Sequence, residues 1–379
     1  MSQPGLEQLR RFAVARSLFP PTSLDCALQR FGFVQADPIR APARAQDLTM
    51  RHRVVDYRAG DLERHYTSLG IEEDFFINYG FVTPAVYALM HPRRIVPAWP
   101  SPGKTRSERL IAFVRERGAV HPREAQERFA HGTVTNYWGG TSNATTHLLD
   151  ALHYRGLLRV AGRRAGIRVY APTDRPSSSL SATEVRVRVD ALIDVVVRIY
   201  APLPRPSLST TVSRLRYAVP QWSKELKAGL RRAHERLARE RVDAVDWFWP
   251  ADEDPRLAAP GEEVRLLSPF DPVVWDRRRF ELLWGWAYRF EAYTPVARRK
   301  LGYYALPLLW RDRVIGWANV SMRQGELRAD LGFVERRRPS GRSFKCALER
   351  ELDRMRRFLD PGSGVRDQGS GRPGSGDPD

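Results

Sequence analysis

The order of elements in residues 104–176, three helical patterns followed by two short strands, restricts the fold of this chain more than any other feature. Thr105 and Glu108 fit a capping box at the start of the first helix. The third helix is predicted over residues 142–156, and a basic turn separates two strands in residues 157–172. This order is typical of a winged-helix domain, whose third helix can enter a DNA major groove while the hairpin contacts phosphates.

A second, similar domain is predicted over residues 181–252. Apolar side chains between Val185 and Ile199 recur in steps of three and four, so we expect a helix there despite the many valines. Two further helices follow, and a strand that begins near Val242 completes the order. We interpret this segment as another winged helix.

The C-terminal segment, residues 256–360, changes to an alternating pattern with turn residues between the apolar runs. Three such runs between Tyr303 and Glu335 predict a β-meander, part of a small antiparallel sheet or barrel, and a helix closes it. Residues 361–379 are rich in Gly, Ser and Pro, and we expect them to be disordered.

The N-terminal segment, residues 1–100, is predicted to hold two short helices, a strand and an arginine-rich stretch. Prolines in residues 91–104 indicate a linker to the next domain. The predicted fold is therefore of the α+β class, with tandem winged-helix (helix-turn-helix) domains over 1–100, 104–176 and 181–252 and a C-terminal antiparallel β-barrel-like domain over 256–360.

The charge of the chain points to a polyanionic partner. Lys and Arg number 62 and Asp and Glu 44, which gives a net charge of +18 and an isoelectric point near 10.5. No apolar run reaches the roughly 18 residues of a membrane span, and the N-terminus has no secretory pattern. Cys26 and Cys346 are too far apart for a metal-binding spacing. We expect a cytoplasmic, nucleoid-associated monomer that needs no metal or cofactor.

A short extended run, FGFVQADPIR in residues 31–40, carries the candidate catalytic groups. Side chains alternate along a strand, so Gln35 and Asp37 are expected on one face, and Pro38 keeps Asp37 out of the helical region. The carboxylate can activate a water or stabilise a positive charge, and the amide can hold the same water. The alternative for so short a pattern is structural: a polar strand face that ends in an Asp-Pro turn.

The segment FGFVQADPIRAPARAQDLTMRHR resembles the signature of the AlkZ/YcaQ-like bacterial DNA glycosylases. That family carries a Gln-apolar-Gln or Gln-apolar-Asp motif, and Gln35-Ala36-Asp37 matches the second form. The resemblance extends to residues 266–279 and 289–320 and covers roughly residues 6–335. It departs where residues 75–84, FFINYGFVTP, lack the Trp-x-His-Glu segment common in the family, and Ala36 is smaller than the usual apolar residue.

The resemblance implies a hydrolase that removes alkylated purines from double-stranded DNA in base excision repair and unhooks interstrand crosslinks. In this interpretation Asp37 stabilises the sugar cation and activates water, and Gln35 positions that water. No metal or cofactor takes part in this reaction.

DNA is expected to contact two groups of polar residues. The first group follows the motif and consists of Arg40, Arg44, Gln46, Arg51 and Arg53. The second group lies at the start of the third helix of the 104–176 domain and consists of Asn143, Thr145, Thr146 and His147. For the second group, helix capping and solvation are the alternative role.

Two other functions are compared with the glycosylase. A non-catalytic winged-helix DNA-binding protein or transcriptional regulator accounts equally well for the charge and the helix pattern, but it does not require the Gln-x-Asp motif or the C-terminal block. An RNA-binding module is disfavoured because the chain has no aromatic RNP-like motif.

Overall fold

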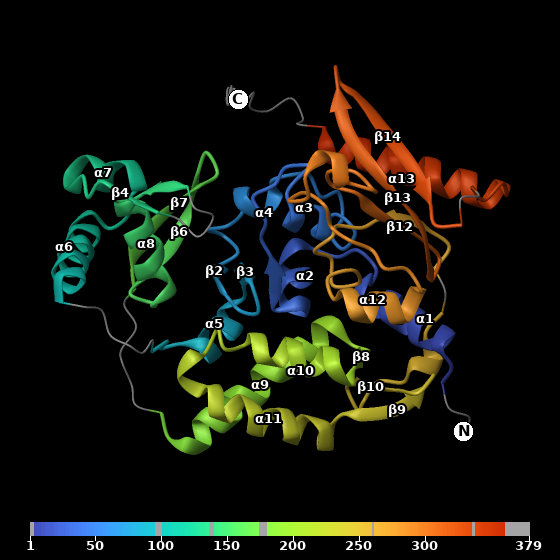
Figure 1. Cartoon of the computed structure of the whole chain (residues 1–379), viewed down its shortest axis with the longest axis horizontal. Coiled ribbons are helices and arrows are strands. Elements are labelled where there is room, and N and C mark those ends of the chain that lie inside the picture. The colour runs from blue at the N-terminus through green and yellow to red at the C-terminus, as the bar shows by residue number, and fades with distance from the viewer. Residues whose placement is uncertain are drawn as a thin grey trace.

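A computed structural model describes residues 4–94, 101–135, 140–173, 180–259, 261–335 and 338–360, with the side chains of 101–103 excepted. The predicted disordered tail, residues 361–379, and the centre of the predicted linker lie outside the described residues. In Figure 1, the part of the chain from α6 to β7 forms a separate lobe beside a larger body that holds all the other elements.

The N-terminal segment surrounds a three-stranded antiparallel sheet of order β1-β3-β2. As predicted, Gly32 ends the second helix in a left-handed conformation with φ of 74°. The elements are α1 (Leu6–Ser17), α2 (Leu24–Phe31), β1 (Phe33–Gln35), α3 (Ala45–Met50), α4 (Asp61–Arg64), β2 (Glu72–Phe75), β3 (Tyr79–Val82) and α5 (Pro84–Met90).

The lobe has the predicted three helices followed by a hairpin, with one additional short hairpin before the third helix. Its elements are α6 (Ser101–Arg117), α7 (Pro122–Phe129), β4 (Thr133–Thr135), β5 (Thr141–Asn143), α8 (Ala144–Tyr154), β6 (Leu158–Arg164) and β7 (Ile167–Pro172). The predicted capping box at Thr105 is wrong, because α6 begins at Ser101 and its first turn accommodates Pro102. The end of the predicted linker, residues 101–104, is therefore helical.

The third segment confirms the helix predicted from its valine-rich repeat. Ser181 and Glu184 form a capping box at the start of α9 (Ala182–Tyr200), and most of the apolar side chains from Val189 to Tyr200 are buried. The remaining elements are β8 (Leu203–Pro204), α10 (Arg205–Arg214), η1 (Pro220–Trp222), α11 (Ser223–Arg236), β9 (Ala238–Val242) and β10 (Val245–Trp249). The strands pair in the order β8-β10-β9.

The C-terminal segment contains the predicted meander, but its sheet is open. The described strands pair in the order β11-β12-β13-β14, so β11 and β14 are edges and the barrel interpretation is corrected to a four-stranded sheet covered by α13. The elements are η2 (Pro255–Leu257), β11 (Val264–Leu266), α12 (Arg277–Trp284), η3 (Val296–Arg298), β12 (Leu306–Trp310), β13 (Arg313–Arg323), β14 (Glu326–Phe333) and α13 (Arg342–Leu359).

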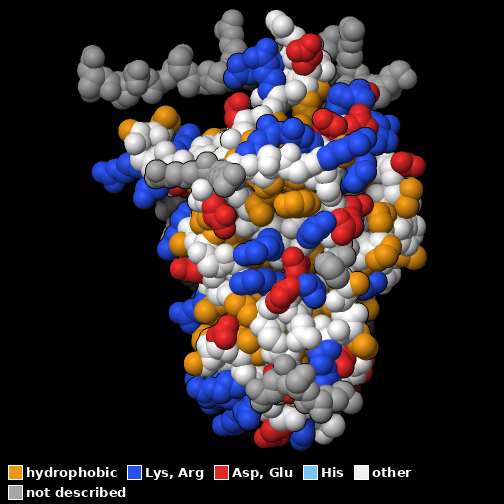
Figure 2. Space-filling view, turned by 90° about the vertical axis from the view of Figure 1, so that its right-hand side faces the viewer, with side chains coloured by type: hydrophobic (Ala, Val, Ile, Leu, Met, Phe, Trp, Pro, Cys, Tyr) orange, Lys and Arg blue, Asp and Glu red, His pale blue; other side chains and the backbone are white. Residues whose placement is uncertain are grey.

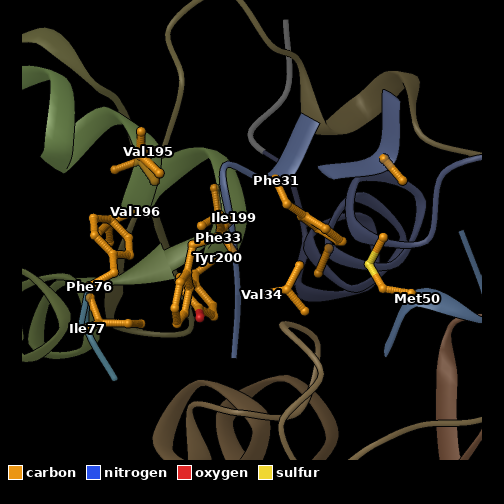
Figure 3. Close-up of a cluster of buried hydrophobic side chains, with 14 of the residues drawn as sticks. Phe31, Phe33, Val34, Met50, Phe76, Ile77, Val195, Val196, Ile199 and Tyr200 are labelled. Atoms are coloured by element: carbon orange, nitrogen blue, oxygen red, sulfur yellow. The ribbon is translucent and has the colours of Figure 1, made fainter. Parts of the chain in front are cut away.

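One hydrophobic core joins the first, third and C-terminal segments. Figure 3 shows Val196, Ile199 and Tyr200 of α9 beside Phe33 of β1 and the neighbouring Phe76. The same buried cluster continues into β12 and α13, whereas the lobe has a core of its own. Strand β1 is thus fixed by packing within the larger body.

Acidic and basic side chains alternate over one broad face of the molecule (Figure 2). A surface of mixed sign does not attract the DNA backbone as a uniformly basic one would. The net charge of +18 therefore does not make every face a DNA-binding surface.

Candidate active site

Strand β1 carries Gln35 at its last position, and the chain turns directly after it. The Ala36 N–H still donates to the Tyr79 carbonyl, at 3.0 Å. The Asp37 carboxylate then accepts a hydrogen bond from the Ile39 N–H, at 2.9 Å. Asp37 therefore lies in an Asp-Pro turn beyond the strand and not on the strand itself.

A glycine makes the position of Gln35 attainable. Gly80 of β3 pairs with Gln35, and a Cβ at residue 80 would overlap the Val34 carbonyl oxygen and lie 2.9 Å from the Gln35 Cα. Only glycine lets the two strands approach this closely.

The amide of Gln35 is held by Asn78, which follows β2. The two side chains are 2.9 Å apart, and in one orientation of its amide Asn78 donates to Gln35 Oε1. In the other orientation the Asn78 oxygen accepts from the Trp275 indole N–H, at 3.2 Å. Both arrangements fix Asn78 beside Gln35, so the segment that lacks the Trp-x-His-Glu pattern supplies an amide to the site.

Gln35 and Asn78 form part of the wall of a cavity of about 580 Å³. Helix α10 supplies Ser207 and Arg214, and the hydroxyl of Ser207 is buried without a hydrogen-bond partner in the described structure. The C-terminal segment supplies aromatic and basic side chains: Phe270, Trp275, Arg277, Arg278, Tyr288 and Phe290. The cavity combines aromatic walls with a few polar side chains, as small-molecule sites commonly do.

Asp37 is half-buried and follows Gln35 by two positions, but it is not among the residues that line the cavity. Burial raises its pKa, and the hydrogen bond from Ile39 opposes that rise. No Lys or Arg within the described ranges forms an ion pair with it. Burial, and then the Asp37 charge, also raise the pKa of Tyr293 and Tyr304.

Two of the predicted DNA contacts are wrong because the side chains are buried in ion pairs. Arg53 is 0% exposed and donates to both Asp271 carboxylate oxygens, at 2.7 and 3.0 Å. Arg51 donates to Glu351 Oε1, at 2.9 Å, with only 3% of its side chain exposed. These arginines connect the N-terminal segment to the C-terminal one and are not available to phosphates.

Three further residues after the motif differ in their exposure. Gln46 is buried; its Oε1 accepts from the Asp37 N–H at 3.4 Å, so it positions the motif and the prediction that it binds DNA is wrong. Arg44 is largely buried in an ion pair with Glu63, and burial, followed by the charge of Arg40, lowers its pKa to about 10. Arg40 is exposed and remains a predicted DNA contact.

The four predicted DNA contacts at the start of α8 also differ in their exposure. Asn143 caps the helix by accepting from the Thr146 N–H, at 3.0 Å, which is the alternative role considered from the sequence. Thr145 is fully buried against His131, so a DNA contact by Thr145 is excluded. His147 is exposed and Thr146 partly so, and both remain predicted contacts.

Two arginines of the β6–β7 hairpin form hydrogen bonds with carboxylates of the same chain. Arg159 and Arg163 each make two hydrogen bonds to a carboxylate of β2, Arg159 to Glu72 and Arg163 to Glu73. The expectation that this hairpin contacts phosphates is therefore limited to its exposed tip, where 71% of the Arg164 side chain is accessible.

Comparison with known proteins identifies the family. A family model described as DNA glycosylase AlkZ-like matches residues 28–358, which include Gln35, Asp37 and every residue of the cavity wall. The chain belongs to the AlkZ-like DNA glycosylase family.

The DNA glycosylase AlkZ of Streptomyces sahachiroi has a similar structure, with a TM-score of 0.62. The alignment covers 94% of this chain and 97% of that one at 15% sequence identity. This similarity shows a shared fold. Together with the family match it confirms the resemblance inferred from the sequence.

Several cavity residues of this AlkZ-like chain were not predicted. Ser207 and Arg214 lie far from the motif in sequence, and nothing local marks them. Phe270, Arg277 and Phe290 lie within the C-terminal segments that resemble the family, and that resemblance could have marked them as site residues.

The described residues contain no cluster of three or more His, Cys, Asp or Glu able to hold a metal ion. Among the helices the structure describes, none has the length and apolar character needed to cross a membrane.

Proposed function

We propose that this AlkZ-like protein hydrolyses the N-glycosidic bond of N7- or N3-alkylated purines in DNA. The observation that supports the proposal most strongly is the Asp37 carboxylate, which has no cationic partner among the described residues and follows Gln35, a residue of the cavity wall, by two positions. A carboxylate neutralised by an arginine could not stabilise a developing cation as well.

The reaction builds positive charge on the deoxyribose as the bond to the base breaks. Asp37 stabilises that charge and removes a proton from the attacking water. Burial raises the pKa of this carboxyl, which makes it a stronger base than an exposed aspartate. Gln35, held by Asn78, orients the water, which attacks the anomeric carbon of the sugar.

The leaving group needs little help from the protein. An N7- or N3-alkylated purine carries a positive charge that is neutralised when the bond breaks, so no general acid is required. Water is the only nucleophile in this scheme, and the enzyme is therefore monofunctional.

The cavity is the proposed site for the damaged base. Its volume of about 580 Å³ falls within the range of small-molecule sites, and Phe270 and Phe290 offer aromatic surfaces for stacking. The Ser207 hydroxyl, buried without a partner in the described structure, and the Arg214 guanidinium can hydrogen-bond to the edge of a purine. In this scheme the exposed side chains of Arg277, Arg278 and Arg40 contact the flanking phosphates.

The test uses a duplex with one N7-methylguanine and a second duplex with a nitrogen-mustard crosslink. After incubation, alkali cleaves the DNA at any abasic site, and gel electrophoresis measures the product. We expect cleavage at the methylated position with the wild type and at least about 100-fold slower cleavage with Asp37→Asn. Release from the crosslinked duplex as well would extend the activity to unhooking.

An absence of cleavage on both substrates would refute the proposal. If the same protein instead bound one DNA sequence tightly at high salt, the chain would be a non-catalytic regulator.

A further inference from the structure

The loop between α12 and β12 exposes large apolar side chains next to the active site. Tyr293 is 69% exposed, Val296 75% and Tyr303 44%. Single exposed apolar residues are common, but three within the eleven residues 293–303 of this loop form a patch that suggests a partner.

This loop is fixed at its base. The buried Glu291 carboxylate accepts hydrogen bonds from the Lys300 and Leu301 N–H groups, at 2.8 and 2.7 Å. The Asn319 side chain of β13 donates to the Leu301 carbonyl, at 2.7 Å, and Arg299 donates to the Thr294 carbonyl, at 2.8 Å. The exposed rings are therefore presented by a preorganised loop.

Aromatic contacts connect the loop to the cavity. Phe290 lines the cavity, and its ring centroid is 6.0 Å from that of Tyr293 and 5.1 Å from that of Tyr304. Phe270, also in the cavity wall, is 5.2 Å from Phe290. A nucleotide that stacks on Tyr293 would therefore lie beside the nucleotide whose base occupies the cavity.

The charge of the loop fits a nucleic acid. Arg298 and Lys300 are exposed, and neither forms an ion pair with a described acidic residue. Arg299 lies over the Tyr303 ring, 5.1 Å from its centroid. Exposed aromatic rings between unpaired cations are the features with which proteins stack on bases and hold the backbone.

We propose that Tyr293 stacks on the base next to the lesion and holds the strand open, so that the damaged purine can enter the cavity while Arg298 and Lys300 contact the flanking phosphates. This inference rests on the proposed glycosylase function. Tyr293 acts here as a positioning residue, because it touches the neighbouring nucleotide and not the reacting atoms.

The experiment compares three variants. Tyr293→Ala removes the ring, Tyr293→Phe keeps the ring and removes only the hydroxyl, and Leu257→Ala removes an apolar side chain that is 83% exposed in η2. Single-turnover release of N7-methylguanine is measured from a fully paired duplex and from a duplex with an abasic analogue opposite the lesion. Unpairing costs less in the second duplex, so a residue that holds the strand open matters less there.

We expect Tyr293→Ala to slow release from the paired duplex at least about fivefold, the lower end of what a stacking contact contributes. Release from the unpaired duplex should change less than about twofold, and Tyr293→Phe and Leu257→Ala should match the wild type. Equal slowing on both duplexes, or no slowing on either, would overturn the inference.

A binding measurement tests the role of Tyr293 independently of base release. In the Asp37→Asn background, 2-aminopurine placed opposite the lesion should brighten when the protein binds and the damaged base leaves the stack, and Tyr293→Ala should remove that signal. If the wild type releases no base but the signal still depends on Tyr293, the proposed function fails and the strand-opening role stands. If the signal is unchanged by Tyr293→Ala, the strand-opening role fails.

Discussion

Gly80 of β3 lies directly opposite Gln35 of β1, and no side chain larger than hydrogen fits between the two strands at that point. The candidate catalytic glutamine thus depends on a glycine 45 residues away in the sequence.

Gly80→Ala should therefore separate β1 from β3. A methyl group would overlap the Val34 carbonyl oxygen, and forced overpacking of this kind costs about 1–3 kcal/mol. Urea denaturation should show that loss of unfolding free energy, and excision should fall with it. Gly341→Ala is the control, because nothing lies within 4 Å of a Cβ there; an equal loss in the control would contradict the packing argument.

Arg53 should matter for stability, and Arg40 for DNA binding. Arg53→Met leaves the Asp271 carboxylate buried without its partner, and breaking such a pair costs about 3–5 kcal/mol of unfolding free energy. Arg40→Ala should leave the melting temperature unchanged and reduce the slope of log affinity against log salt by about 0.9, provided that Arg40 contacts one phosphate. The reverse pattern would show that Arg53, not Arg40, contacts DNA.

Asp74 should stabilise the junction between β2 and the lobe in a pH-dependent way. Burial alone would raise its pKa, but the Arg93 guanidinium, at 2.8 Å, and the His91 hydrogen bond lower it well below its ordinary value. Because the pKa is lower in the folded state, the ionised Asp74 carboxylate stabilises the fold above about pH 4, and this stabilisation is lost as the pH falls.

At pH 7, Asp74→Asn should thus lower the unfolding free energy by about 3–5 kcal/mol, since it leaves Arg93 buried without its carboxylate partner. Denaturation at several pH values should show the gap between the two proteins narrowing below about pH 4. A gap that is constant down to pH 2 would contradict the lowered pKa.

Local patterns in the sequence predicted the elements well. The three- and four-residue steps from Val185 to Ile199 gave α9, and the alternation after Tyr303 gave β12 to β14, because each pattern reflects the burial of one face. The prediction of a capping box at Thr105 was wrong because the same residue pattern can occur inside a helix and at its start.

Long-range contacts could not be read from the sequence. Arg53 and Arg40 stand in the same arginine-rich stretch, yet one pairs with a carboxylate 218 residues away and the other is exposed. The cavity likewise joins Gln35 to Ser207 and Phe290, which only the packing of three segments brings together. The sequence was enough to predict the chemical roles of Gln35 and Asp37, but it was not enough to predict which side chains surround them.

The buried charge of Asp37 should lower stability as well as support catalysis. Because burial raises its pKa, its contribution favours folding below about pH 4 and is lost as the pH rises through the raised value. Asp37→Asn should therefore be more stable than the wild type at pH 7 and similar to it near pH 3, as measured by thermal denaturation. Lower stability of the variant at pH 7 would instead favour a structural Asp-Pro turn.

The single-turnover rate of N7-methylguanine release by Asp37→Asn, relative to the wild type, tests the central claim most directly. Asparagine keeps the size and the hydrogen bond to Ile39 but removes the charge that stabilises the sugar cation. We predict a rate at least about 100-fold lower, with DNA affinity equal or slightly higher. Release at the wild-type rate by a folded, DNA-binding variant would show that Asp37 is not the catalytic carboxylate.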